Sequence, residues 1–101
     1  MAITSTSSAD GQSLTIAING RFDFSSHQDF RRAYEASSNK PAAYTIDMRG
    51  ATYLDSSALG MLLLLRDYAG GDDSSISIVN ANDDVKKILA ISNFEQLFTI
   101  Q

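Results

Sequence analysis

The chain has 101 residues, a formal net charge of −4 and no cysteine. This length predicts one domain over residues 1–101, and the lack of cysteine excludes disulfides and thiolate metal sites. The negative charge argues against nonspecific binding to nucleic acid or anionic lipid. The N-terminus shows no secretory signal, and the longest apolar run, residues 61–65, is far too short to span a bilayer. We therefore expect a cytoplasmic protein without direct membrane insertion.

The N-terminal segment predicts a β-hairpin. Residues 2–7 and 14–18 flank the turn-forming residues 9–12, and leucine and isoleucine alternate in the second strand. We expect Gly20 to end that strand and residues 21–24 to lead out of it.

A helix is predicted next, with Ser25 or Ser26 as its N-cap and its end at Ser38-Asn39, before Pro41. The apolar spacing assigns its inner face to Phe30, Ala33, Tyr34 and Ser37. His27, the only histidine, is expected to lie at the surface or in the cap, because one histidine cannot build a metal site.

Residues 44–48 alternate as a strand, and residues 49–52 are expected to turn the chain. The helix that follows, from about Ser57 to Tyr68, is apolar around nearly its whole circumference. So small a domain cannot enclose such a helix fully, and part of one face should remain accessible. Gly60 lies inside this helix, where glycine usually indicates a close backbone approach, here either to the sheet or to a partner.

The C-terminal part predicts a strand at residues 75–80, a helix capped by Asn82 and an edge strand at residues 97–100. The element order is then β-β-α-β-α-β-α-β. This order predicts an α/β fold with a mixed sheet of about four to five strands and about three to four helices.

Asp55, Ser56 and Ser57 stand where the apolar helix should begin. Such residues cap helices, and the helix N-terminus also favours an anionic group such as a phosphate. The three residues are therefore either a plain cap or a capped helix start whose serine can be phosphorylated. We expect Ser57 to be the cap or the first helical residue.

No catalytic motif is present. The chain has no phosphate-binding glycine loop, no zinc-protease motif and no cysteine nucleophile, and nothing places His27 near Ser56. We expect a non-enzymatic binding or switching module without cofactor or metal.

The segment Leu54–Gly60, with Gly20–Asp23 and the closing residues 92–98, resembles STAS domains (sulphate transporter and anti-sigma factor antagonist). The family pattern D-S-S/T-G-L-G appears here as D-S-S-A-L-G, so that Ala58 replaces a usual glycine. The resemblance covers essentially the whole chain and implies a single STAS-like domain.

The resemblance implies a bacterial anti-sigma factor antagonist. Such a protein binds an anti-sigma factor, often itself a serine kinase, and is inactivated by phosphorylation that a PP2C-type phosphatase reverses. The phosphorylated serine corresponds to Ser56, with Ser57 as the second choice. The residues expected to contact the partner are Asp23, Asp55, Ser56, Ser57, Ala58, Gly60 and Met61.

Two alternatives remain open. The chain would be a constitutive STAS subunit of a transporter or stress-signalling assembly if Ser56 were never modified. It would be a carrier of a nucleotide or other small molecule if the turn before the helix bound one.

Overall fold

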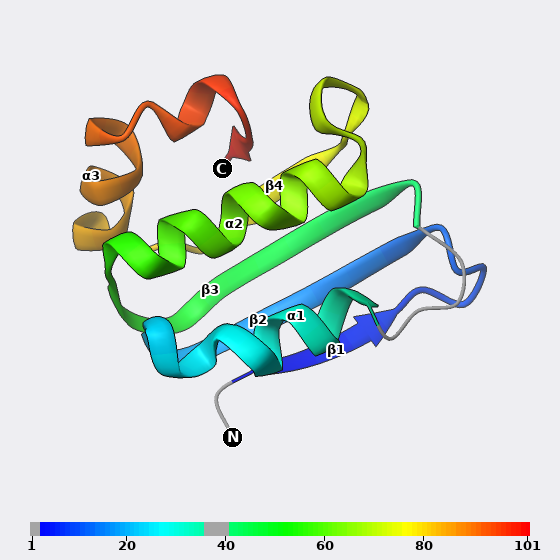
Figure 1. The fold of residues 1–101 in the computed structure, drawn as a ribbon, viewed down its shortest axis with the longest axis horizontal. Helices are drawn as coiled ribbons and strands as arrows, with labels where there is room; N and C mark the ends of the chain where they lie inside the picture. Colours follow the sequence, from blue (N-terminus) through cyan, green and yellow to red (C-terminus); the bar gives the residue numbers. More distant parts are fainter. Residues whose placement is uncertain (1–2, 36–40) are drawn as a thin grey trace.

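A five-stranded sheet forms the body of the computed structural model, which describes residues 3–35 and 41–101 (Figure 1). The strands are β1 (Ile3–Ser7), β2 (Ser13–Phe22), β3 (Ala43–Leu54), β4 (Ile76–Val79) and β5 (Thr99–Ile100). The α-helices among the described residues are α1 (His27–Glu35), α2 (Ser56–Ala69) and α3 (Asp83–Ile91). Three short 3-10 helices, η1 (Phe24–Ser26), η2 (Gly71–Asp73) and η3 (Phe94–Gln96), connect them.

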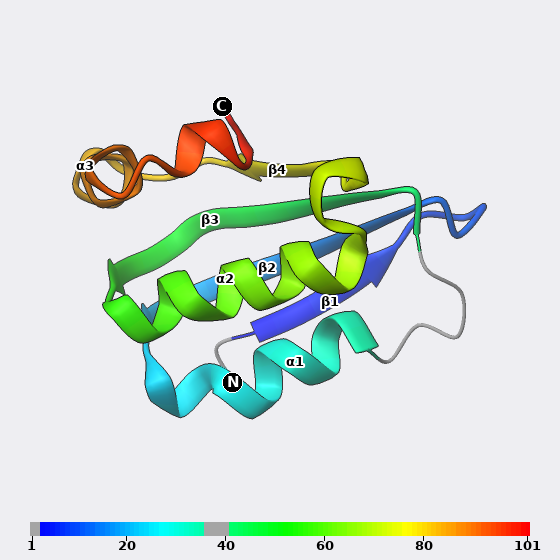
Figure 2. The same ribbon diagram turned by 45° about the horizontal axis from the view of Figure 1, so that its top comes forward.

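The strands lie in the order β1-β2-β3-β4-β5. β1 is antiparallel to β2, and all other neighbours are parallel, which confirms the predicted hairpin and the mixed α/β sheet. α1 follows β2 and α2 follows β3. Because β2 and β3 are parallel, both helices begin at the same edge of the sheet. The two helices run side by side in the same direction across one face of the sheet (Figures 1 and 2).

The core lies between this face of the sheet and the helices. Alternate residues of the central strands are fully buried, among them Ile16, Ile18 and Ile46. From α2, Leu62 and Leu65 pack into the same core and are also fully buried. Burying a side chain of this size contributes about 1.5–3 kcal/mol, so α2 is fixed firmly on the sheet.

The two central strands are longer than predicted. β2 continues through Gly20 to Phe22, and β3 continues through Arg49–Thr52 to Leu54, so neither segment is a turn. The pairing register shifts on both sides of Asn19-Gly20, where Gly20 has a φ of 83°. At each shift β3 contains one residue more than β2, so the bulges lie in β3 opposite this part of β2, and the two strands continue together beyond them.

The start of α1 also differs from the prediction. Asp23, rather than Ser25 or Ser26, caps the preceding η1, and its carboxylate accepts a hydrogen bond from the Ser25 backbone N–H. On the predicted inner face, Phe30 and Tyr34 are buried. The predicted Ser37 contact and the predicted helix end at Ser38-Asn39 lie outside the described residues.

The C-terminal elements follow the prediction closely. Asn82 caps α3 and accepts a hydrogen bond of 2.9 Å from the Val85 backbone N–H. β5 is shorter than expected because the backbone N–H groups of Leu97 and Phe98 both donate to the Phe94 carbonyl oxygen instead of pairing in the sheet. Phe94 also stacks on Phe98, with 5.3 Å between ring centroids. None of the helices in the described part of the chain has the length and apolar character needed to cross a membrane.

Candidate functional site

The beginning of α2 is built around Asp55. This residue keeps the extended backbone of β3, and its carboxylate accepts a hydrogen bond of 2.9 Å from the Ala58 backbone N–H. Asp55 is therefore the N-cap, Ser56 is the first helical residue and Ser57 the second. The expectation that Ser57 is the cap or the first helical residue is wrong, because Asp55 is the cap and accepts a hydrogen bond from the third helical residue, Ala58.

Ser56 is exposed at this helix start, whereas Ser57 is half-buried. The Ser56 hydroxyl makes no hydrogen bond to any part of the chain that the structure describes. It stands in the first turn of α2, where unpaired backbone N–H groups and the helix dipole favour negative charge. A phosphate on this oxygen would thus meet solvent and the positive end of the helix.

Two of the predicted partner-binding residues belong to the core instead. Ala58 is completely buried and Met61 is 3% exposed, both on the side of α2 that faces the sheet. Their side chains do not face a partner. The replacement of the family's usual glycine by Ala58 therefore adds a methyl group to the packing against the sheet.

Asp23 is brought to the same end of the sheet by strand pairing. Phe22 is opposite Leu54, and the Asp55 backbone N–H lies 3.4 Å from the Phe22 carbonyl oxygen. Asp23 and Asp55 follow these paired residues directly, so both residues lie at the end of the sheet where α2 starts. The Ser25 hydroxyl, its hydrogen-bond donor, lowers the pKa of Asp23, which keeps that carboxylate ionised.

Exposed aromatic residues surround this end of the molecule. Phe24 in η1 is 74% exposed, and Tyr53 near the end of β3 is 41% exposed with the Arg21 guanidinium 4.4 Å from its ring centroid. The sequence analysis assigned no role to either. In a continued strand Phe22 and Phe24 would share one face, so the pattern gave no signal that Phe24 faces outward; the strand ends at Phe22, and Phe24 begins η1 instead.

The outer face of α2 carries Gly60 and two exposed leucines. A Cβ atom at Gly60 would have open space around it, with no atom within 4 Å beyond its own neighbours and helix backbone. Close packing on the sheet is therefore not the reason for this glycine, which leaves the partner as the remaining alternative. Leu63 and Leu64 are 41% and 54% exposed, which confirms that one face of the apolar helix remains accessible.

His27 lies at the start of α1, half-buried, and stacks on Phe24 with 6.2 Å between ring centroids. It makes no hydrogen bond to Ser56 in the described residues, so a hydrolase triad is not assembled. The residues that the structure describes also contain no group of three or more histidine, aspartate or glutamate residues able to hold a metal ion. What the site offers is an exposed serine at the start of α2, next to the capping Asp55, at the end of the sheet where Asp23, Phe24 and Tyr53 also lie.

Comparisons with known proteins agree with this fold. The family model described as Mlab, STAS domain, matches residues 5–99. A STAS-domain containing protein of Pseudomonas aeruginosa (strain UCBPP-PA14) is 67% identical over 100 residues, which span 99% of each chain.

Two solved structures share the arrangement of strands and helices. A sulfate transporter family protein from Wolinella succinogenes has a TM-score of 0.75 and 14% identity, over 93% of this chain and 80% of that chain. The anti-sigma factor antagonist SpoIIAA in its unphosphorylated form has a TM-score of 0.76 and 13% identity, over 99% of this chain and 87% of that chain. At these identities the likeness shows the fold alone.

Proposed function

The chain belongs to the STAS-domain family, and from this membership we propose that it is an anti-sigma factor antagonist controlled by phosphorylation of Ser56. In this proposal the unmodified chain acts in the cytoplasm and binds an anti-sigma factor or a serine kinase. Phosphorylation releases the partner, and a PP2C-type phosphatase restores binding. The chain itself performs no catalytic step.

The observation that carries the proposal is the position of Ser56. Its hydroxyl is exposed and unbonded within the described residues, so that a kinase can reach it, and it lies at a helix N-terminus that tolerates an anion. Ser57 is half-buried and is the second choice for modification.

Phosphorylation would act on binding rather than on the fold. A phosphoserine brings about −1.5 to −2 charges at neutral pH. These charges would lie beside Asp23 and Asp55, and docking would require the removal of their water. A loss of about 3 kcal/mol in binding free energy weakens affinity more than a hundredfold.

The surface around Ser56 has the composition of a docking site. Phe24 and Tyr53 provide exposed aromatic area, which is frequent among the residues that dominate binding energy in interfaces. Gly60 leaves the α2 backbone bare and so permits close approach of a partner.

The proposal is tested by capture and phosphorylation. The tagged chain is used to isolate its partner from the native host, and the isolated kinase is incubated with the chain and ATP. Mass spectrometry should find one phosphate on Ser56 and none on the variant Ser56→Ala. Partner binding should be kept by Ser56→Ala and lost by Ser56→Asp. A phosphate elsewhere, or full binding by Ser56→Asp, would contradict the proposal.

A second candidate function is a constitutive STAS subunit of a transporter or stress-signalling assembly. The fold that this chain shares with the sulfate transporter family protein is compatible with it. This function predicts that the chain co-purifies with membrane transporter subunits and that both Ser56→Ala and Ser56→Asp leave this association unchanged.

A further inference from the structure

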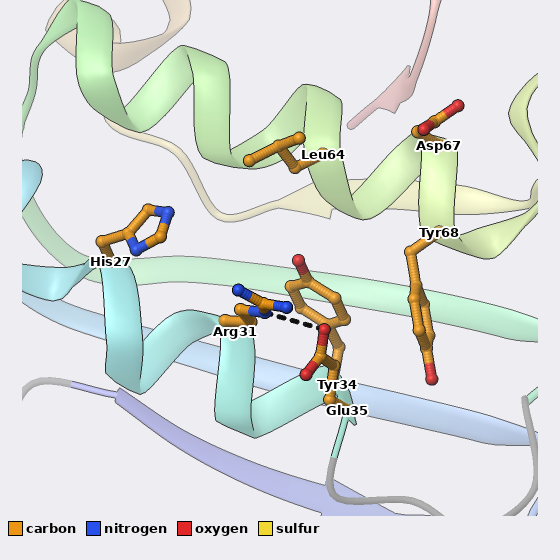
Figure 3. A pocket seen from close by; sticks show the side chains of 7 residues that line it. All are labelled: His27, Arg31, Tyr34, Glu35, Leu64, Asp67 and Tyr68. Carbon is orange, nitrogen blue, oxygen red and sulfur yellow. Dashed lines mark hydrogen bonds and ion pairs between the residues drawn. The ribbon is translucent and has the colours of Figure 1, made fainter.

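A groove of about 260 Å³ lies between α1 and α2, on the side of these helices away from the sheet (Figure 3). Residues from both helices line it, chiefly His27, Arg31 and Glu35 from α1 and Leu64, Asp67 and Tyr68 from α2. None of these residues has a role in the phosphorylation switch described above.

The groove continues the surface that begins at Ser56. Ser56, Gly60, Leu64 and Asp67 recur at helical spacing and therefore share one face of α2. α1 and α2 run in the same direction (Figure 1), and the groove lies beside the C-terminal half of α2, beginning at Leu64, about two turns beyond Ser56. A partner that docks at Ser56 and extends along α2 meets the groove.

Two of the α2 residues that line the groove offer apolar surface. Leu64 is 54% exposed, and the Tyr68 ring packs against Tyr34 at 5.0 Å between centroids (Figure 3). Covering the exposed leucine and the partly exposed tyrosine with an apolar surface would stabilise a complex, because it removes apolar area from water.

The charges that line the groove leave one acidic group uncompensated. Arg31 Nε donates to Glu35 Oε2 at 2.8 Å, so these two opposite charges pair on α1. Asp67, on α2, is exposed and forms no ion pair within the described residues. With His27 neutral, the lining has a net negative charge. The groove therefore favours a cation over an anion.

We propose that this groove binds a basic side chain of the protein partner, with a lysine or arginine laid across Leu64 and Tyr68 and its cation at Asp67. The apolar stem of such a side chain suits Leu64 and the tyrosine ring, and its charged end stays near water at Asp67. That this side chain belongs to the partner docking at Ser56 rests on the proposed function.

The first test needs no partner and uses n-pentylammonium, an analogue of the lysine side chain, with pentanoate as an anion of similar length. In methyl NMR titrations, pentylammonium should shift the Leu64 methyl signals, and pentanoate should not. Asp67→Asn should weaken the pentylammonium effect at least about threefold, within the range of an exposed ion pair. Asp84→Asn, the same change at an exposed site on α3, should leave it unchanged. Absence of shifts, stronger shifts with pentanoate, or equal shifts in Asp67→Asn would overturn the assignment of a basic side chain.

The second test uses the partner isolated with the tagged chain. Leu64→Lys should weaken its binding at least about tenfold, as expected for a residue that dominates an interface. Ile91→Lys is the matched control, because Ile91 is an 82% exposed aliphatic residue on α3, away from the groove. Both variants should melt at the temperature of the wild type. Equal binding by Leu64→Lys and wild type, or equal loss in both variants, would overturn the proposal that the partner binds in the groove.

The two claims fail separately. Loss of binding in Leu64→Lys with full binding in Ser56→Asp would keep the groove and refute the phosphorylation switch. Loss in Ser56→Asp with full binding in Leu64→Lys would keep the switch and refute the groove.

Discussion

Among single residues, Asp55 does most to define the start of α2, because its carboxylate accepts the Ala58 backbone N–H. Replacing an N-cap aspartate by alanine costs about 0.5–2 kcal/mol. We therefore expect Asp55→Ala to lower the free energy of unfolding by this amount in urea titrations, and Asp55→Asn to retain most of it because asparagine caps equally well. Equal stability of Asp55→Ala and wild type would show that the cap contributes nothing.

Asp23 gives a prediction about pH. Hydrogen bonds, chiefly from the Ser25 hydroxyl, hold the pKa of Asp23 below its ordinary value of 3.8. A lowered pKa means that the ionised carboxylate stabilises the fold above this ordinary value, and that the contribution disappears as the pH falls through the lower value. In NMR titrations Ser25→Ala should raise the Asp23 pKa toward 3.8. An unchanged pKa in this variant would show that the hydroxyl is not its cause.

The sequence was sufficient to locate the segment that forms the site. It was not sufficient to predict which side chains in that segment are exposed and which are buried. The helix start at residues 55–57 was found because polar cap residues precede an apolar run. The burial of Ala58 and Met61 was missed, because a helix that is apolar on every side does not reveal which side meets the sheet. Phe24 was missed because its outward direction depends on the 3-10 turn that Asp23 caps.

Among the elements, β2 and β3 show why turn signals can mislead. Gly20 and the segment Arg49–Thr52 resemble chain reversals in sequence, yet both lie inside paired strands. The bulges in β3 opposite Gly20 depend on the pairing of two distant segments, which local sequence does not encode. α2 and α3, whose signals are local, were predicted almost to their bounds, and the hairpin was predicted except for the extension of β2.

Two glycines give opposite predictions for the elements that contain them. Gly20 has a φ of 83°, and alanine there would be strained by about 1–2 kcal/mol. Gly60 is helical and its Cβ position is open, so Gly60→Ala should stabilise α2 by about 0.5–1 kcal/mol. Thermal unfolding of both variants measures the contrast. Destabilisation by Gly60→Ala would mean that the chain itself needs this glycine.

Gly60→Ala also separates stability from binding. If the partner backbone approaches Gly60 closely, the variant should bind more weakly although it is more stable. Calorimetric titration with the isolated partner measures this. Unchanged affinity would show that the partner does not approach Gly60 closely, and the glycine would then have no structural explanation.

For the whole molecule, the net charge of −4 becomes about −5.5 to −6 after one phosphorylation. The added charge lies at an exposed helix N-terminus, so the fold should change little. We expect the free energy of unfolding of Ser56→Asp to remain within about 0.5 kcal/mol of the wild type, as for other surface substitutions. Urea denaturation measures this free energy. A larger loss of stability would show that the added charge acts on folding rather than on partner binding.

The central claim is that one exposed hydroxyl at the start of α2 controls binding of a protein partner. Its most direct test is the affinity of the isolated partner for the unmodified chain and for the chain phosphorylated on Ser56, both measured by calorimetry at the same salt concentration. The account predicts that phosphorylation weakens binding at least about a hundredfold while the melting temperature stays nearly constant. Equal affinity of the two forms would contradict it.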